Sequence, residues 1–225
     1  FNGGMSFQID NVALQVPLAL NLDQTVSGTL DAQTQQRDYR FTLADSATVQ
    51  LDRLNSGTGS SVSWQITDVA TGTTVASSTL TPGTSTPSQP TFALPPGLYA
   101  LRVSISDFVP SSYAFRLLNA STATPMVSGQ VVEGRLEPTG ESVIYSVDVA
   151  AGDRLFVDLR DLATRTYSYD ALKGFWHYNY SSTVRIVDPY GRTVATQDIG
   201  DAELVATVSG RYSIVLDGSL VYDTP

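Results

Sequence analysis

An internal repeat constrains the fold of this chain more than any other feature. Three short apolar runs return 106 residues later, so that Gly28 corresponds to Gly134 and Tyr39 to Tyr145. The matched runs are 26–30, 39–43 and 49–52 in the first copy, and 132–136, 145–149 and 155–158 in the second. A constant spacing over three runs predicts two copies of one folding unit.

The apolar residues lie in short alternating or continuous runs. Each run is bounded by Gly, Pro, Asp, Asn or Ser, which is typical of strands. In 61–68, for example, Val62, Trp64 and Ile66 share one side of the predicted strand. No segment shows a capped helical stripe. The fold class predicted is all-β, with two tandem antiparallel β-sandwiches. In the first copy we expect strands at 25–30, 38–44, 47–52, 61–68, 73–79, 90–94, 97–104 and 112–118.

The two copies differ in their loops and at their ends. The spacing grows to 120 residues at the hairpins that begin at Asp68 and Asp188, and it is 113 residues from Gly97 to Gly210. Loops tolerate such changes in length. The sequence stops before a counterpart of the predicted strand 112–118. We therefore expect a first sandwich at 17–121, a second at 122–225 that lacks its last strand, and a separate segment at 1–16.

Four motifs recur in the same order in both copies. They are Gly-x-Leu (28–30 and 134–136), Tyr-x-Phe or Tyr-x-Val (39–41 and 145–147), the hairpin turn (68–72 and 188–191) and Gly-x-Tyr (97–99 and 210–212). The arrangement resembles the bacterial pre-peptidase C-terminal domain family over roughly 22–118 and 128–218. The resemblance implies jelly-roll-like sandwiches that are appended to secreted proteases, collagenases and large surface proteins as accessory or binding modules. The recurring tyrosines are expected to pack in the core, with the hydroxyl reaching a backbone partner.

Residues 1–16 belong to neither copy. The run 6–14 resembles the last strand of a lectin-like jelly roll, where an Ile-Asp-Asn-Val-x-Leu ending recurs. Alternatively, it is an edge strand or tail docked on the first copy, or a donor strand that completes a second copy in an array. Because the chain begins with Phe1, we expect it to be an excerpt of a longer protein.

The charge balance limits the partners. Acidic residues number 22 and basic residues 13, which gives a net charge of −9. Such a surface repels nucleic acid and anionic lipid, and no apolar run approaches the length of about 20 residues that spans a membrane. The chain has no cysteine, so it offers neither a disulfide nor a thiolate metal site. A cysteine-free β protein rich in Ser and Thr is compatible with bacterial secretion.

An aromatic insertion at 166–181 belongs to the second copy alone, and it also holds the single His and single Lys of the chain. Aromatic faces can stack on sugar rings or on prolines, while His177 or Asn179 orients a hydroxyl. Alternatively, Trp176, Val184 and Ile186 share the inner face of one long core strand. The candidate ligand-binding residues are Tyr167, Tyr169, Trp176, His177, Tyr178 and Asn179.

Calcium is the one metal that the sequence suggests. Asp198, Asp201 and Glu203 lie near one turn, and Asp158 and Asp161 near another, and hard cations prefer such oxygen ligands. The alternative is that these are solvated turn acids. A single His without Cys does not make a usual zinc site.

The sequence carries no motif of a known catalytic site, neither Gly-x-Ser-x-Gly nor His-Glu-x-x-His nor a phosphate loop. We therefore expect no enzyme activity. The function predicted is that of non-catalytic structural or adhesive spacer and binding modules in a large secreted or cell-surface bacterial protein. The alternative is an accessory module of a secreted hydrolase or protease that binds carbohydrate or fibrous protein through 167–180. The expected partners are neighbouring domains, with no nucleic acid and no membrane insertion.

Overall fold

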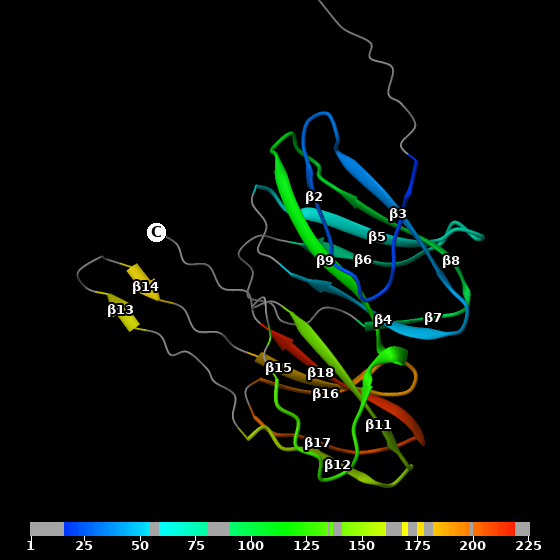
Figure 1. Cartoon of the computed structure of the whole chain (residues 1–225), viewed down its shortest axis with the longest axis vertical. Coiled ribbons are helices and arrows are strands. Elements are labelled where there is room, and N and C mark those ends of the chain that lie inside the picture. The colour runs from blue at the N-terminus through cyan, green and yellow to red at the C-terminus, as the bar shows by residue number, and fades with distance from the viewer. Residues whose placement is uncertain are drawn as a thin grey trace, which may run out of the picture.

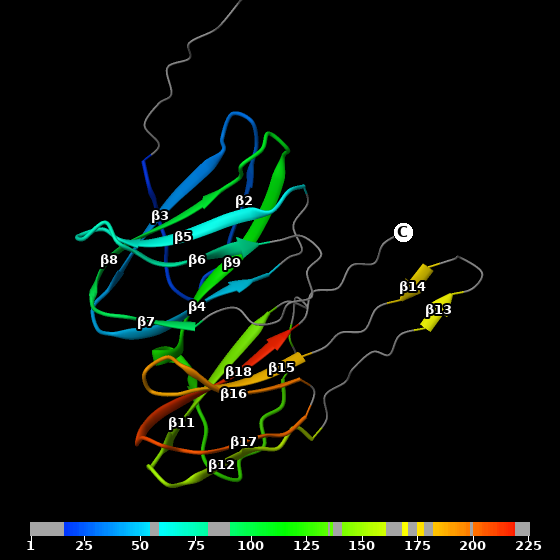
Figure 2. The ribbon, with the colours of Figure 1, turned by 180° about the vertical axis from the view of Figure 1, so that it is seen from behind.

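The computed structural model describes residues 16–54, 59–80, 91–134, 136, 141–160, 168–170, 175–177, 182–198 and 200–218. In this part of the chain every element is a strand, apart from one short 3-10 helix, η1 (Ala120–Thr122). The strands form two sandwich bodies that lie one above the other (Figures 1 and 2). The predicted all-β fold class is confirmed.

The first body, module 1, consists of two packed sheets. One sheet has the order β1 (Leu18–Ala19), β3 (Gln36–Leu43), β8 (Gly97–Ser104), β5 (Val62–Asp68) and β6 (Thr74–Leu80). The other has the order β2 (Val26–Leu30), β9 (Ser111–Asn119), β4 (Ala47–Arg53) and β7 (Thr91–Leu94). All pairs are antiparallel except β1 with β3.

The second body, module 2, repeats the larger sheet and part of the smaller one. Its sheet has the order β10 (Thr124–Pro125), β11 (Ser142–Val149), β18 (Gly210–Gly218), β15 (Ser182–Val187) and β16 (Thr193–Asp198). A ribbon of β12 (Arg154–Val157) and β17 (Ala202–Val205) covers the inner face of that sheet. A further hairpin pairs β13 (Ser168–Asp170) with β14 (Phe175–His177).

The period-two pattern accounts for the core of module 1. Val62, Trp64 and Ile66 are each no more than 1% exposed, while Ser63 and Gln65 between them are exposed. All eight strands expected in the first copy form, with their ends shifted by no more than two residues. Local alternation therefore specifies which face of each strand enters the core.

The recurring Gly-x-Tyr tyrosines play the same part in both modules. Tyr99 and Tyr212 are buried, and each hydroxyl donates to a carbonyl four residues earlier, on Pro95 at 2.7 Å and on Val208 at 3.0 Å. The expectation of a backbone partner is confirmed for this pair. Tyr39 differs, because its hydroxyl lies 2.7 Å from the hydroxyl of Tyr113 on β9.

The two modules meet through the outer faces of two sheets. Strand β4 is buried on both of its faces, because one face enters the module 1 core and the other contacts module 2. Strand β18 likewise shows an unbroken buried run from Tyr212 to Val215. The sheet β2-β9-β4-β7 therefore packs against the sheet β10-β11-β18-β15-β16 (Figure 1).

Candidate functional site

The contact between the modules contains a buried network of polar side chains. Period-two geometry directs residues 50 and 52 away from the core that Val49 and Leu51 enter, and therefore toward module 2. Arg116 on β9 joins them from module 1. Module 2 contributes Glu141, Ser142, Arg185 and Asp217.

One half of the network centres on Asp217, whose side chain is 1% exposed. Arg185 donates to both of its carboxylate oxygens, from Nε at 2.5 Å and from Nη2 at 3.1 Å. The amide of Gln50 bridges the modules, since its Nε2 donates to Asp217 at 2.9 Å and its Oε1 accepts from Arg185 at 2.9 Å. The Ser142 hydroxyl also donates to Asp217, at 2.7 Å.

The other half centres on Arg116. Its guanidinium donates to Asp52 Oδ2, from Nη2 at 2.6 Å and from Nε at 3.1 Å, and its Nη1 donates to Glu141 of module 2 at 2.7 Å. Nη2 also donates to the carbonyl of Ser142 at 3.1 Å. The backbone N–H of Ser142 donates to Asp52 Oδ1 at 3.0 Å. Asp52 and Arg116 are thus paired with each other, and each also binds a group of module 2 across the contact.

Burial changes the acidity of Asp52. Desolvation raises the pKa of its carboxyl to about 7, although Arg116 and Ser142 act in the opposite direction. A single guanidinium serves two carboxylates here, because Glu141 shares Arg116 with Asp52. Burial therefore outweighs the attraction of Arg116 and sets the direction of the pKa shift of Asp52.

An apolar seam surrounds the network. It is a cluster of buried apolar residues from both modules, namely Leu118, Ala120, Ile144, Val187 and Val215. The half-buried Ala123 packs against this cluster. At the edge, Gly191 lies so close to Ala93 of β7 that a Cβ would be 3.1 Å from the Ala93 nitrogen. The Thr91 hydroxyl donates to the Gly191 carbonyl at 3.2 Å. The 188–191 turn that the sequence singled out thus docks on module 1.

Sequence reasoning missed this contact, because Thr183 and Arg185 alternate with the apolar Val184 and Ile186 in the way that solvent-facing residues of a strand do. As whole residues, Thr183 and Arg185 are each 2% exposed, because module 1 covers that face of β15. The available signal was charge within predicted strands, since Asp52 and Arg116 both interrupt apolar strands. Charged residues are seldom buried unless they are paired, so their positions pointed to a second packed surface.

The structure describes only part of the aromatic insertion. Tyr167, Tyr178 and Asn179 lie outside the described residues. Tyr169, Trp176 and His177 belong to β13 and β14, with Tyr169 opposite Trp176 and Ser168 opposite His177 in the register.

The alternative of one long core strand is wrong. Trp176 pairs in the β13–β14 hairpin, whereas Val184 and Ile186 lie fully buried in β15 of another sheet. Strand pairing therefore separates residues that one alternating pattern had joined.

Four of the five carboxylates proposed for calcium are described, and each of the four binds a different partner. Asp198 accepts from the Thr183 hydroxyl at 2.9 Å and Asp201 from the Leu159 N–H at 2.9 Å. Glu203 pairs with Arg154 at 2.6 Å and Asp158 with Arg160 at 2.8 Å, while Asp161 lies outside the described residues. Within the described ranges, no three His, Cys, Asp or Glu side chains gather as a metal site would require. Calcium binding stays a prediction.

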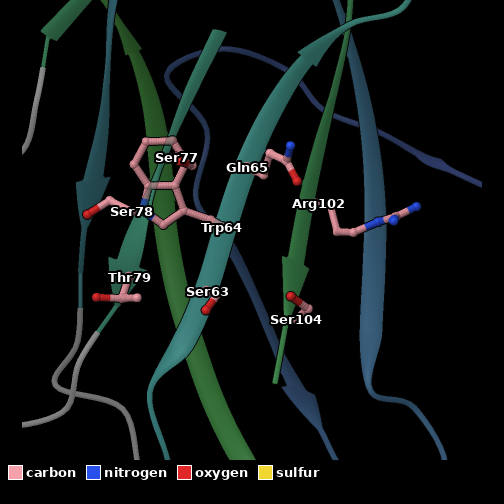
Figure 3. Close-up of a pocket in the computed structure, with 8 residues that line it drawn as sticks. All are labelled: Ser63, Trp64, Gln65, Ser77, Ser78, Thr79, Arg102 and Ser104. Carbon is pink, nitrogen blue, oxygen red and sulfur yellow. The ribbon is translucent and has the colours of Figure 1, made fainter. Parts of the chain in front are cut away.

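A shallow depression of about 450 Å³ lies over β5, β6 and β8 of module 1. In Figure 3, Gln65 and Arg102 extend to one side of these strands and Trp64 extends to the other. Arg102 is already paired with Asp38 at 2.7 Å. The remaining lining is made of hydroxyl groups and one amide, namely Ser63, Gln65, Ser77, Ser78, Thr79 and Ser104. Such a surface offers weak hydrogen bonding and no concentrated charge.

No family model matches the chain, and no curated protein matches it. Among solved structures, it is similar to the pre-peptidase C-terminal domain of collagenase from Bacillus anthracis, with a TM-score of 0.40 and 20% sequence identity. The match covers 48% of this chain and 99% of that domain. In the described part of the chain, no helix has the length and apolar character needed to cross a membrane.

Proposed function

We propose that this chain is a non-catalytic structural unit, a two-module spacer with a fixed relative orientation, within a larger extracellular or surface-attached bacterial protein. The observation that supports this proposal is the buried network between the modules. Gln50 and Arg116 of module 1 bind side-chain and backbone groups of module 2 in the interior of the contact. Neighbouring domains of the parent protein are the proposed partners.

The direction of the hydrogen bonds between the modules matters more for a fixed orientation than their strength does. Contacts between domains usually permit motion unless they are large and apolar. Each hydrogen bond here contributes only about 0.5–1.5 kcal/mol, or about 1.5–3 kcal/mol where a charged group takes part. These bonds are directional, however, and they converge on Asp217 and Ser142 from both sides of the contact. A rotated arrangement would leave buried groups unpaired, which favours a single orientation.

A distance measurement between the modules tests the proposed spacer. The chain has no cysteine, so two introduced cysteines can carry spin labels at defined sites. Suitable exposed positions on different modules are given by Thr73→Cys and Ala151→Cys. Pulsed electron double resonance should give one narrow distance distribution. Gln50→Ala should broaden it, because this change removes the bridging amide and leaves the Arg185–Asp217 pair in place.

The matched control is Gln65→Ala, an exposed amide on the module 1 face that carries the depression. This change should leave the distribution narrow. A broad distribution in the unmodified protein would contradict a fixed orientation and indicate two independently moving modules.

A second candidate function is binding of a glycan or fibrous protein by the aromatic insertion. It is favoured by the register of the β13–β14 hairpin, which places the Tyr169 and Trp176 positions opposite each other. Aromatic residues in such pairs are common in recognition of sugars and proline-rich chains. The candidate residues remain those proposed from the sequence.

Trp176→Ala should abolish binding in a glycan array or a collagen pull-down without lowering the melting temperature. Phe108→Ala is the matched control, because this aromatic side chain is 70% exposed on module 1. Equal signals from both variants and the unmodified protein would exclude the insertion as the binding surface.

A further inference from the structure

The linker between the modules consists of η1 and Ala123 alone. Strand β9 ends at Asn119, η1 follows directly, and Ala123 lies between η1 and β10, the first strand of module 2. Ala120 of η1 is buried in the apolar seam. The Ser146 hydroxyl of β11 donates to the Ala123 carbonyl at 3.4 Å. A contact that holds η1 to module 1 therefore also holds the start of module 2.

Asp23 provides such a contact from the turn between β1 and β2, at the end of module 1 that faces module 2 (Figure 1). Its Oδ1 accepts from the backbone N–H of Asn119 at 2.8 Å, and its Oδ2 accepts from the Thr122 hydroxyl at 3.0 Å. That hydroxyl shares its hydrogen with the Asn119 carbonyl, which lies 2.8 Å away. The N–H of Asp23 donates to the Leu117 carbonyl at 3.0 Å. One carboxylate thus binds the chain immediately before η1 and at the last residue of η1.

The backbone of Asp23 is unusual as well. Its φ is +63°, and no other non-glycine residue in the described part of the chain has a positive φ. The repeat offset of 106 residues continues into this turn, because the N–H groups of Leu20 and Met126 donate to equivalent carbonyls of β3 and β11. It pairs Asp23 with Gly129, whose φ is +81°. A left-handed backbone favours glycine, and aspartate is one of the few other residues that adopt it. Module 1 therefore keeps a carboxylate where the backbone favours glycine, and the contacts with the linker give that carboxylate a role.

We propose that Asp23 clamps the linker and thereby sets the direction in which module 2 leaves module 1. This inference rests on the proposed role as a spacer of fixed orientation, and it assigns part of that role to a residue outside the buried network. A single bond would let η1 pivot, whereas the bonds to Asn119 and Thr122 fix both of its ends. The clamp holds the point where the chain crosses between the modules, while the network holds the facing sheets.

The clamp also differs from the network in its exposure. Asp23 is exposed, whereas Asp52 and Asp217 of the network are fully buried. Hydrogen bonds of exposed groups compete with water, so their net contribution to stability is small. Loss of the Asp23 carboxylate should therefore change the orientation of the modules much more than the melting temperature. Asp23 is in this sense a positioning residue, which acts on module 2 through the linker.

The test introduces Asp23→Gly into the full chain that carries the spin labels at positions 73 and 151. Glycine adopts a positive φ without strain, so the turn keeps its conformation while the carboxylate is lost. The distance distribution should broaden as strongly as it does in Gln50→Ala. Hydrogen exchange of the Asn119 amide, followed by NMR, should become about tenfold faster or more, because this N–H loses a charged acceptor. The melting temperature should fall by no more than about 4 °C, since the changed side chain is exposed.

Two further variants accompany this test. Asp23→Asn should keep the distribution narrow, because asparagine tolerates the same φ and its amide oxygen can still accept from the Asn119 N–H. Asp31→Gly is the matched control, since the Asp31 carboxylate binds only the N–H groups of Gln33 and Thr34 within its own loop, at the opposite end of module 1 (Figure 1). This change should leave the distribution narrow.

The outcomes separate the clamp from the spacer. A narrow distribution both in the labelled chain without further change and in its Asp23→Gly variant would overturn the clamp and leave the spacer standing. Broadening by Asp31→Gly as strong as that by Asp23→Gly would also overturn the clamp, because it would show a general loosening of module 1. A broad distribution in the labelled chain without further change would contradict the spacer and the clamp together.

Discussion

Replacing Asp217 with alanine should lower the free energy of unfolding by about 3–5 kcal/mol, because the change leaves a buried cation without its partner. The Arg185 side chain is only 3% exposed and has its main anionic contact on Asp217. Gln50 and Ser142 would also lose an acceptor. Urea unfolding followed by circular dichroism measures the loss.

Two further variants test the cause. Asp38→Ala breaks an ion pair on the surface of module 1, where Arg102 is 50% exposed, and it should cost no more than about 1 kcal/mol. The double variant Arg185→Met with Asp217→Leu removes both charges and should recover most of the stability. A small loss from Asp217→Ala alone would mean that water reaches the network and that the modules are not tightly packed.

Glycine-to-alanine substitution at equivalent positions of the two modules should lower the stability of module 1 and leave that of module 2 almost unchanged. Gly28→Ala should destabilise module 1 by about 1–3 kcal/mol, because its methyl group would overlap the Tyr113 ring. That ring cannot easily move, since it stacks on Phe115 and its hydroxyl binds Tyr39. Gly134→Ala should change stability by no more than about 0.5 kcal/mol, because its nearest neighbour is 3.8 Å away.

Thermal unfolding of the two single variants beside the unmodified chain makes this comparison. The change is chemically identical at both positions, and only Gly28 lies under a tyrosine ring. A similar loss at both positions would show that the glycines serve backbone conformation in each copy and would contradict the role of the Tyr113 ring.

Much of the fold could be predicted because it depends on local alternation. The strand 61–68 was recognised from Val62, Trp64 and Ile66, and these residues are buried as expected. The recurrence of Tyr99 and Tyr212 likewise indicated a shared packing role. Both features follow from side chains that alternate along one strand and from turns that a few residues specify.

The candidate site could not be predicted in the same way. Gln50 and Arg185 are polar and lie on the face of their strands opposite the core, which normally indicates solvent. Their burial depends on a second sheet that is distant in sequence. The aromatic insertion gave the converse error, since parity alone joined Trp176 to Val184 and Ile186, while pairing places them in separate sheets.

The sequence by itself determined the repeat, the strands of the first copy and the side of each strand that enters a core, because these depend on neighbours within a few residues. The tertiary structure alone decided which polar faces are buried and which runs pair as strands. The runs 26–30 and 132–136 share one pattern, yet among the described residues only the first forms a strand, paired along its length with β9. A strand is completed by hydrogen bonds to another segment, and that partner is not specified by the run itself.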